Sequence, residues 1–434
     1  MPIWNKRCET MPREDMEQLQ IERLQLTVNR AYRNVRFYHK RFEKLGIEPE
    51  DVTSPADLGR LPFTTKEDLC DAYPYEMFSV PLKEIVRIHS SSGSSGQGAV
   101  IGYTRNDLRT WSDLVARVVS GAGVTKNDVL QVTFDYGLFT GGFGIHYGAE
   151  RVGASVIPAS GGNTERQIRI MKDFKTTALV GTPSYALHIA EVMEQMDVDR
   201  DAFSLRLGLF GGEPFPECLR AEIEDRLGIS ATDNYGISDV MGPGIAGECE
   251  HKCGLHVNED HFLAELVNPS TLEPVGYGEQ GELVLTTITK QGMPLIRYRT
   301  RDLTTLNPER CSCGRTTVRM SKIAGRTDDM LIIRGINVYP SQIEAILYEI
   351  EGVEPHYRII VDRVEAMDEL TVLVEVSADI ITDQISRLVQ LEEKIRDRIH
   401  AVVGLTPKLR LVEPKTLQDS PDAAQRVVDN RNLS

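Results

Sequence analysis

Long apolar segments are missing from this 434-residue chain, which is 41% hydrophobic and 26% charged. A helix needs about 20 consecutive apolar residues to cross a bilayer, so no part of the sequence is expected to span one. The first seven residues, Met1 to Arg7, also lack the apolar core of a secretory signal peptide. These absences predict a cytoplasmic protein.

An excess of positive charge is missing as well, since the formal net charge is −15. That balance argues against non-specific binding to nucleic acid or to an anionic membrane surface. The length is ample for a large core and for two or more domains. The seven cysteines are an odd number, and a cytosolic chain is expected to keep them reduced.

Lysine is missing from the most distinctive stretch, the ten residues from His89 to Gly98, which contain five serines and three glycines. Backbone N–H groups of such a loop can turn toward an anion, and the hydroxyls can supplement them, which is the chemistry of a phosphate cradle. The loop is not a Walker A motif, because no Gly-Lys-Ser/Thr ends it. The same composition is also typical of a flexible connector, and the loop alone leaves both interpretations open.

Downstream of this loop, short apolar strands alternate with helical segments, which predicts a largely parallel sheet covered by helices. The expected strands are 129–134, 154–158, 177–180 and 205–210, and the expected helices are 107–120, 164–173, 185–196 and 217–227. Ligands of such sheets bind beyond the carboxyl ends of the strands. Four polar, glycine-rich segments fall there and predict a site: 136–142, 160–162, 211–214 and 233–239.

The sequence before and after this region has a different pattern of apolar residues. Residues 13–40 show the apolar spacing of one amphipathic helix, and from Phe262 the pattern becomes antiparallel, with strands expected at 282–289 and 294–298. Beyond Asp328 the pattern restarts as a compact α+β unit with helices at 340–349 and 383–403 and strands at 357–362, 370–376 and 409–412. We therefore expect an α/β protein with an N-terminal domain (1–327) of mostly parallel, helix-covered sheets plus a small β-rich subdomain, and a small mobile C-terminal domain (328–434).

Several motifs occur in the order typical of the acyl-adenylate-forming superfamily, and nearly the whole chain resembles its phenylacetate–CoA ligases. They are Pro62–Lys66, the Ser91–Gly98 loop, Tyr136–Gly142, Asn234–Gly244, Glu259–Phe262, Tyr298–Leu303, Gly325–Asp329 and Met330–Glu344. The resemblance implies a ligase of phenylacetate catabolism that uses ATP, Mg²⁺ and coenzyme A and forms acyl-AMP, then acyl-CoA and AMP. Its partners would be the aryl acid, ATP and CoA, without nucleic acid or membrane, and the chain would act as a monomer or a homodimer.

The resemblance also implies roles for individual residues. Asp239 would bind Mg²⁺, Arg326 would support the ribose contact of Asp302, Asp328 would be the hinge between the two half-reactions, and Tyr235 would stack on adenine. The cofactor-binding set is Ser91, Ser92, Gly93, Ser94, Ser95, Gly96, Gly212, Glu213, Pro214, Asp233, Asn234, Tyr235, Gly236, Ser238, Asp302, Arg326, Arg334 and Gly335. The aryl pocket would include Tyr136, Phe139, Gly142 and Gly236, because an aromatic ring needs apolar and aromatic walls.

The chain departs from the family pattern in places that bear on catalysis. Gln97 stands where relatives often have lysine, and Asp239 stands where they usually have glutamate. In the C-terminal segment, Asp422 and Ala423 replace the Gly-Lys whose lysine reaches the α-phosphate, and Lys415 lies eight positions earlier. Three hypotheses follow: a phenylacetate–CoA ligase, an adenylating enzyme of the same fold for another aryl acid or acceptor, and a non-catalytic ligand-binding homologue.

Four of the cysteines form two close pairs with a histidine nearby, Cys249-x₃-Cys253-x₂-His256 and Cys311-x-Cys313. Three thiolates and one imidazole are the ligand set of a structural zinc ion. We favour Cys249, His256, Cys311 and Cys313, because Gly254 allows a tight turn that brings His256 back toward Cys249; Cys253 and His251 are alternative ligands. The competing interpretation is a group of reduced, buried cysteines without metal.

Overall fold

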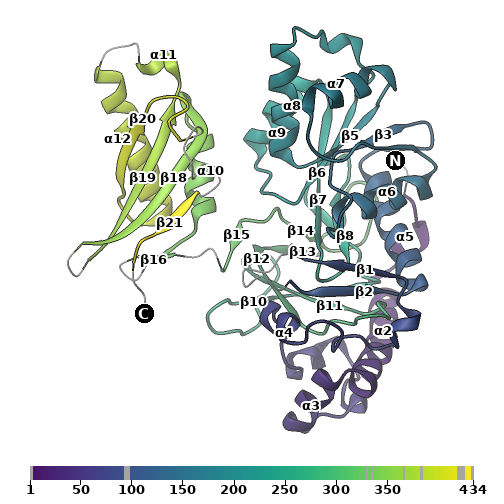
Figure 1. Ribbon diagram of the computed structural model, residues 1–434. Helices are drawn as coiled ribbons and strands as arrows, with labels where there is room; N and C mark the ends of the chain where they lie inside the picture. Colours follow the sequence, from purple (N-terminus) through teal and green to yellow (C-terminus); the bar gives the residue numbers. More distant parts are fainter. Residues whose placement is uncertain are drawn as a thin grey trace. The chain divides into compact units, whose positions relative to one another are not determined.

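The structure, a computed structural model, describes residues 3–91, 98–328, 331–333, 336–364, 367–381, 385–417 and 426–431. The chain divides into two compact units, Met1–Lys322 and Ile323–Ser434 (Figure 1). The expected α/β fold, with a large N-terminal part and a small C-terminal part, is confirmed. The division lies close to Asp328, and the position of the hinge itself stays a prediction. Among the described residues, no helix is long and apolar enough to cross a membrane.

A mixed sheet forms the centre of the first unit, with the strand order β13-β14-β9-β8-β7-β6-β5-β3-β4. The half from β4 to β7 is parallel, as the alternating pattern predicted, whereas β8, β9, β14 and β13 extend it with antiparallel pairs. The bounds are β3 (Val129–Val132), β4 (Ser155–Pro158), β5 (Ala178–Gly181), β6 (Leu207–Gly211), β7 (Ser230–Ile237), β8 (Gly242–Glu248), β9 (Leu255–Val257), β13 (Leu306–Asn307) and β14 (Arg319–Met320).

The helices that connect the parallel strands pack in two groups (Figure 1). Helices α5 (Arg105–Gly121) and α6 (Gly141–Val152) contact each other and β8. Helices α7 (Thr164–Asp173), α8 (Pro183–Gln195) and α9 (Glu217–Leu227) share an apolar core with β5, β6 and β7 that includes Ile189, Phe210 and Ile223. The bounds of α7 and α9 agree with the sequence prediction.

The N-terminal helical region corrects one expectation, because residues 13–40 do not form a single helix. Helix α2 (Arg13–Asn34) ends where Val35 adopts an extended conformation (φ −113°, ψ 107°), and α3 (Arg36–Leu45) begins directly after it. The apolar spacing continues through the break, so periodicity alone does not reveal it. The other short elements here are α1 (Lys6–Glu9), η1 (Pro49–Asp51), η2 (Pro55–Arg60), α4 (Lys66–Asp71), η3 (Leu82–Glu84) and η4 (Arg200–Ala202).

Antiparallel strands form the rest of the first unit. They are the hairpin β1 (Arg87–Ser90) and β2 (Val100–Tyr103), and the neighbours β10 (Phe262–Val267), β11 (Gly281–Thr287) and β12 (Tyr298–Thr304). The strand expected at 294–298 is wrong, since β12 begins only at Tyr298. Arg297 has a positive φ of 46°, and the N–H groups of Ile296 and Arg297 donate to the hydroxyls of Tyr38 and Thr286 instead of a neighbouring strand.

The second unit is built on the hairpin of β18 (Val353–Val364) and β19 (Met367–Val376), with β20 (Lys408–Val412) parallel to β19 and β21 (Val427–Asp429) parallel to β18. Its core joins this sheet to α10 (Pro340–Tyr348) and α12 (Ile385–Val403) through residues such as Ile343, Val372 and Ile395. The remaining elements are β15 (Gly325–Arg326), β16 (Leu331–Ile333), β17 (Ile336–Val338) and α11 (Ala378–Ile381).

Candidate active site

A cavity of about 510 Å³ opens beyond the carboxyl ends of β3 and β5. Strands β3 and β5 are neighbours in the sheet. The chain leaves β3 toward β4 on one side and leaves β5 toward β6 on the other, so a crevice forms between the two connections. This is the topological switch point at which parallel sheets bind ligands. The cavity is lined by Thr133, Phe134, Asp135, Phe139, Gly161, Gly162, Thr182, Ser184, Tyr185 and His188.

Asp239 lies in the turn between β7 and β8, and its buried carboxylate is held from two sides. The ammonium group of Lys66 lies 2.9 Å from each carboxylate oxygen, and the hydroxyl of Tyr298 donates to Oδ2 at 2.8 Å. Lys66 also donates to the hydroxyl of Ser91, where the described part of the Ser/Gly loop begins. The predicted Mg²⁺ ligand is therefore adjacent to the start of the predicted phosphate loop.

Two residues predicted to contact the nucleoside lie together. The Tyr235 hydroxyl on β7 donates to Oδ2 of Asp302 on β12 at 2.6 Å, and both residues are buried. The segment 233–239 was expected to follow the strand as a loop, but β7 continues to Ile237, because it pairs with β8 as well as with β6. The antiparallel partner extends β7 beyond the end of β6, and that extension positions Tyr235.

The loop after β6 faces the start of α8. Gly212 has φ +80°, a left-handed conformation that glycine adopts without strain, and the chain turns there. Glu213 then accepts a hydrogen bond from the Ser184 hydroxyl at 2.6 Å. Asn234 donates from its side chain to the Phe210 carbonyl at 2.6 Å, which fixes β7 against the end of β6. These contacts bring the predicted Gly212–Pro214 and Asp233–Gly236 segments to one edge of the sheet.

Of the predicted aryl-pocket residues, Tyr136 and Phe139 lie on the loop between β3 and α6, Gly142 lies in the first turn of α6, and Gly236 lies on β7. Phe139 is half exposed and lines the cavity, whereas the Tyr136 hydroxyl lies 3.2 Å from Nδ1 of His146. Gly142 and Gly236 leave no room for a side chain: a Cβ atom would lie 2.7 Å and 2.3 Å, respectively, from a backbone carbonyl oxygen. At both positions the glycine therefore packs directly against the backbone of another segment.

Hydrogen bonds join the loop between β3 and α6, called the aromatic loop below because it carries Tyr136 and Phe139, to the neighbouring candidate residues. The carbonyl of Leu138 accepts from the Ser90 N–H at 3.2 Å and lies 2.9 Å from Nδ1 of His89. The hydroxyls of Thr140 and Ser238 lie 2.8 Å apart. The aromatic loop is thus joined to the end of β1 and to the turn that carries Asp239.

Other predicted site residues are placed differently. Ser92, Gly93, Ser94, Ser95, Gly96, Arg334 and Gly335 lie outside the described residues, as do Asp422 and Ala423. Arg326 and Asp328, in the second unit, form a two-point ion pair with each other at 2.9 and 2.7 Å. Their roles in ribose binding and as a hinge stay predictions.

The structure adds residues that the motifs left without a role. Lys66 appeared only as the last residue of a family motif, and its contact with Asp239 spans 173 positions of sequence. Thr182, Ser184, Tyr185 and His188 also line the cavity. Their signal was available, because they follow β5 as the other polar segments follow their strands, but this segment is not glycine-rich.

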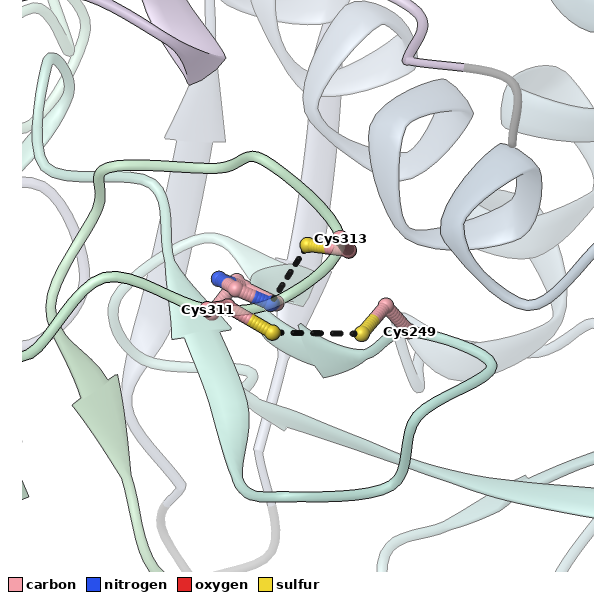
Figure 2. Close-up of side chains that lie close together, drawn as sticks. Cys249, Cys311 and Cys313 are labelled. Carbon is pink, nitrogen blue, oxygen red and sulfur yellow. Dashed lines mark hydrogen bonds between the residues drawn. The ribbon is translucent and has the colours of Figure 1, made fainter.

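Cys249, His256, Cys311 and Cys313 gather at a separate place, and their ligand atoms all lie within 4.8 Å of one another. Figure 2 shows the three cysteine side chains directed toward a common point. Cys253 has its sulfur 3.9 Å from that of Cys311 but is exposed, and His251 is exposed too. Neither belongs to the group of four.

The spacing of these four residues fits a tetrahedral zinc ion. Zinc bonded to sulfur at about 2.3 Å and to nitrogen at about 2.0–2.1 Å separates two sulfurs by about 3.8 Å and a sulfur from a nitrogen by about 3.6 Å. The sulfurs of Cys249 and Cys311 are 3.9 Å apart, and Cys313 Sγ lies 3.5 Å from His256 Nε2. Burial lowers the pKa of His256, which favours the neutral imidazole that metals bind. Its other ring nitrogen lies 3.2 Å from the Thr317 hydroxyl, which orients the ring.

Comparison with known proteins matches residues 57–289 to the AMP-binding enzyme family and residues 335–431 to the AMP-binding enzyme C-terminal domain. Phenylacetate-coenzyme A ligase of Escherichia coli is 46% identical over 98% of this chain and 97% of its own length. The Thermus thermophilus ligase of the same name is 44% identical over 99% of this chain and 100% of its own length. The chain belongs to the phenylacetate–CoA ligase family.

Solved structures agree with this assignment. A crystal structure of 2-hydroxyisobutyryl-CoA ligase in complex with 2-HIB-AMP has a TM-score of 0.89 and 31% identity, covering 98% of this chain and 92% of that chain. The sequence relatives thus assign the phenylacetate–CoA ligase family, and the family models and the fold agree with an AMP-binding enzyme.

In this member of the phenylacetate–CoA ligase family, the carboxyl group of Asp233 is a weaker acid than an ordinary aspartate. Burial and the nearby carboxylate of Glu248 raise the pKa of Asp233 to about 7. Glu248 itself accepts two hydrogen bonds from Arg220 at 2.8 Å and one from the Asp233 N–H at 2.8 Å, so its position is fixed. A carboxyl whose pKa is raised by folding destabilises the folded state progressively as pH rises from its unfolded pKa, about 4, through its folded pKa.

The Asp233→Asn variant removes this titration and should gain stability relative to wild type as pH rises. We expect the difference in Tm, variant minus wild type, to be larger at pH 8 than at pH 5 in the absence of nucleotide. Thermal unfolding at both pH values measures it, with Asp173→Asn on the exposed end of α7 as the control for loss of one charge. An equal difference at the two pH values would contradict the raised pKa.

Proposed function

We propose that this protein is an AMP-forming aryl-acid–CoA ligase and that phenylacetate is its acid. The observation that carries the proposal is a pair of buried carboxylates near the end of β7: Asp302 bonded to Tyr235 on that strand, and Asp239 beside Lys66 in the turn that follows it. They lie where the family motifs are expected to hold the nucleoside and the metal-bound phosphates. The relatives named above support the acid and the acceptor.

In the first half-reaction, a carboxylate oxygen of the acid would attack the α-phosphorus of ATP, and pyrophosphate would leave. In the second, the CoA thiol would lose its proton and attack the acyl carbon, and AMP would leave. Both steps pass through crowded anionic centres, so donors and cations must be placed where the charge develops. No proton donor to the leaving groups is required.

The residues of this chain would divide that work. Tyr235, with the Gly212–Pro214 and Asp233–Gly236 segments, would bind adenine, and Asp302 would accept the ribose hydroxyls. Asp239 would hold Mg²⁺ through its carboxylate; a single carboxylate fits this ion, which usually binds substrate phosphates as well. Bound Mg²⁺ would neutralise charge on the phosphates. The aromatic loop with Tyr136 and Phe139 would form the wall for the aryl group.

The non-catalytic alternative rests on Ala423, which removes a cation expected to act in adenylation, and on Asp239, which stands in place of the usual glutamate. The retained family residues Tyr235, Asp302 and Arg326 and the Ser/Gly loop argue against it. We also propose a cytoplasmic location, where reducing conditions keep the seven cysteines as thiols.

An assay that follows pyrophosphate and acyl-CoA separately tests the function. With ATP, Mg²⁺ and CoA, phenylacetate should release pyrophosphate and form phenylacetyl-CoA with a larger kcat/KM than benzoate, 4-hydroxyphenylacetate or 2-hydroxyisobutyrate. Another acid in first place would favour the same-fold alternative. No pyrophosphate with any acid would favour the non-catalytic homologue.

The Ala423→Lys variant in the same assay tests the cost of the missing cation. Pyrophosphate release should rise by about tenfold or more, within the range that one transition-state charge contact contributes. Thioester formation from supplied acyl-AMP should not change. Lys415→Ala is the matched variant, because a fall in its rate would show that Lys415 already fills the role.

We further propose that Cys249, His256, Cys311 and Cys313 bind a structural zinc ion. Arg315 supports this role, since it donates to the sulfur of Cys313 at 3.6 Å and to Glu9 at 2.6 Å. Zinc would therefore hold the N-terminal segment as well as the loop from Cys311 to Thr317. Four protein ligands would fill a tetrahedral site and leave no open position for water or substrate, which argues against a catalytic role.

Purified protein should contain about one zinc per chain by metal analysis. Replacing Cys311 and Cys313 together with serine should abolish zinc and lower Tm, because the binding free energy of a structural zinc ion contributes directly to folding. The exposed Cys253→Ser variant is the control and should keep the metal. Zinc-free protein prepared under reducing conditions without chelator would contradict the proposal.

A further inference from the structure

The backbone around Lys66 is held in a fixed place beside Ser91 and Asp239. Lys66 is the first residue of α4, whose N-cap is the Thr65 side chain. Thr64, two residues before Lys66, forms backbone hydrogen bonds to the residues on both sides of Tyr298. Its N–H donates to the Arg297 carbonyl, and its carbonyl accepts from the Arg299 N–H, both at 2.9 Å. Tyr298 donates to Asp239, so one strand positions both the lysine and the carboxylate.

The Lys66 side chain has one charged partner and one open side. Its ammonium contacts both oxygens of Asp239 and the hydroxyl of Ser91. The lysine side chain keeps 30% of its surface exposed, whereas Asp239 keeps 6%. A ligand therefore reaches this ion pair from the lysine side.

The two chain segments that contribute Ser91 and Asp239 carry no positive charge of their own. The segment from Ser90 to Gly98 and the segment from Asp233 to Ile245 contain no lysine or arginine. Lys290 lies nearby, but it is fully buried and donates to the carbonyl of Val240 at 2.6 Å. The ammonium of Lys66 is thus an accessible cation that contacts one residue from each of these segments, Ser91 and Asp239.

We propose that Lys66 is a phosphate-binding catalytic residue, whose ammonium moves from Asp239 to a phosphate oxygen of ATP when the nucleotide binds. This inference rests on the proposed function. Without nucleotide, Lys66 neutralises a buried carboxylate that would otherwise be costly. Mg²⁺ and the ammonium compete for the same Asp239 oxygens, and a lysine has the flexible stem and compact charge that let it exchange partners. Lys66 then supplies the cation that neither flanking segment contains.

A purely structural role gives a different expectation. In that case Lys66 would act only by neutralising and positioning Asp239, and its removal would have no effect once Asp239 is uncharged. If Lys66 itself contacts phosphate, its removal weakens ATP binding even when Asp239 has no charge and no metal is present. The two roles are separated by a double-mutant cycle.

The experiment measures the affinity for ATP by isothermal titration calorimetry with excess EDTA. The proteins are wild type, Lys66→Met, Asp239→Asn and the double variant. In the Asp239→Asn background, Lys66→Met should weaken binding by about tenfold or more, the lower end of a charged hydrogen bond. Lys66→Arg in that background should recover most of the affinity. Lys83→Met, an exposed lysine of η3, is the control and should bind as wild type.

Equal affinity of Asp239→Asn and the double variant would overturn the inference and leave the proposed function standing. Wild type that binds ATP with Mg²⁺ but not in EDTA would also overturn the inference alone. Wild type that binds no ATP under either condition would overturn the proposed function and the inference with it. Thermal unfolding checks that each variant is folded. If the double variant does not unfold cooperatively, Lys66→Gln with Asp239→Asn takes its place, because it keeps a hydrogen-bond donor beside the asparagine and still removes the charge.

Discussion

The buried carboxylate of Asp239 is the constraint on which the arrangement of the site depends. A carboxylate removed from water needs partners, and losing one of them costs about 3–5 kcal/mol when the group stays buried. Lys66 and Tyr298 are those partners, and they come from α4 and β12, on either side of Asp239 in the sequence. Satisfying one charge therefore joins three separate segments at the end of β7.

The supports behind these partners extend to the N-terminal helices. Tyr38 on α3 is fully buried; its hydroxyl lies 3.0 Å from that of Thr64 and accepts from the Ile296 N–H at 3.0 Å. The pKa of Tyr38, raised to about 12 mainly by burial, keeps this hydroxyl protonated and available as a donor. The helices before the sheet thus fix the segment that carries Lys66.

The local sequence pattern predicted much of the fold, because the residues that begin and end many helices and strands lie within or next to those elements. Helices α7 and α9 were placed correctly, since Asn163 caps the first and Gly228 ends the second in a left-handed conformation. The errors came from contacts distant in sequence. Tyr38 accepts the N–H of Ile296, which turns an expected strand into irregular structure, and β8 makes strand of the segment around Tyr235.

Part of the candidate site could likewise be predicted from the sequence. Motif order indicated Asp239, Tyr235 and Asp302, and cysteine spacing indicated the group of four ligands, because those signals are carried by residue type. The role of Lys66 could not be predicted, since its partner lies 173 positions away and neither residue is unusual alone. Only the folded chain brings them together.

A crystal structure with Mg²⁺ and a non-hydrolysable ATP analogue tests the central claim most directly. The account predicts that the ammonium of Lys66 lies within hydrogen-bonding distance of a phosphate oxygen and that Asp239 contacts the metal, directly or through water. A bound analogue with Lys66 still paired to both oxygens of Asp239 would contradict it.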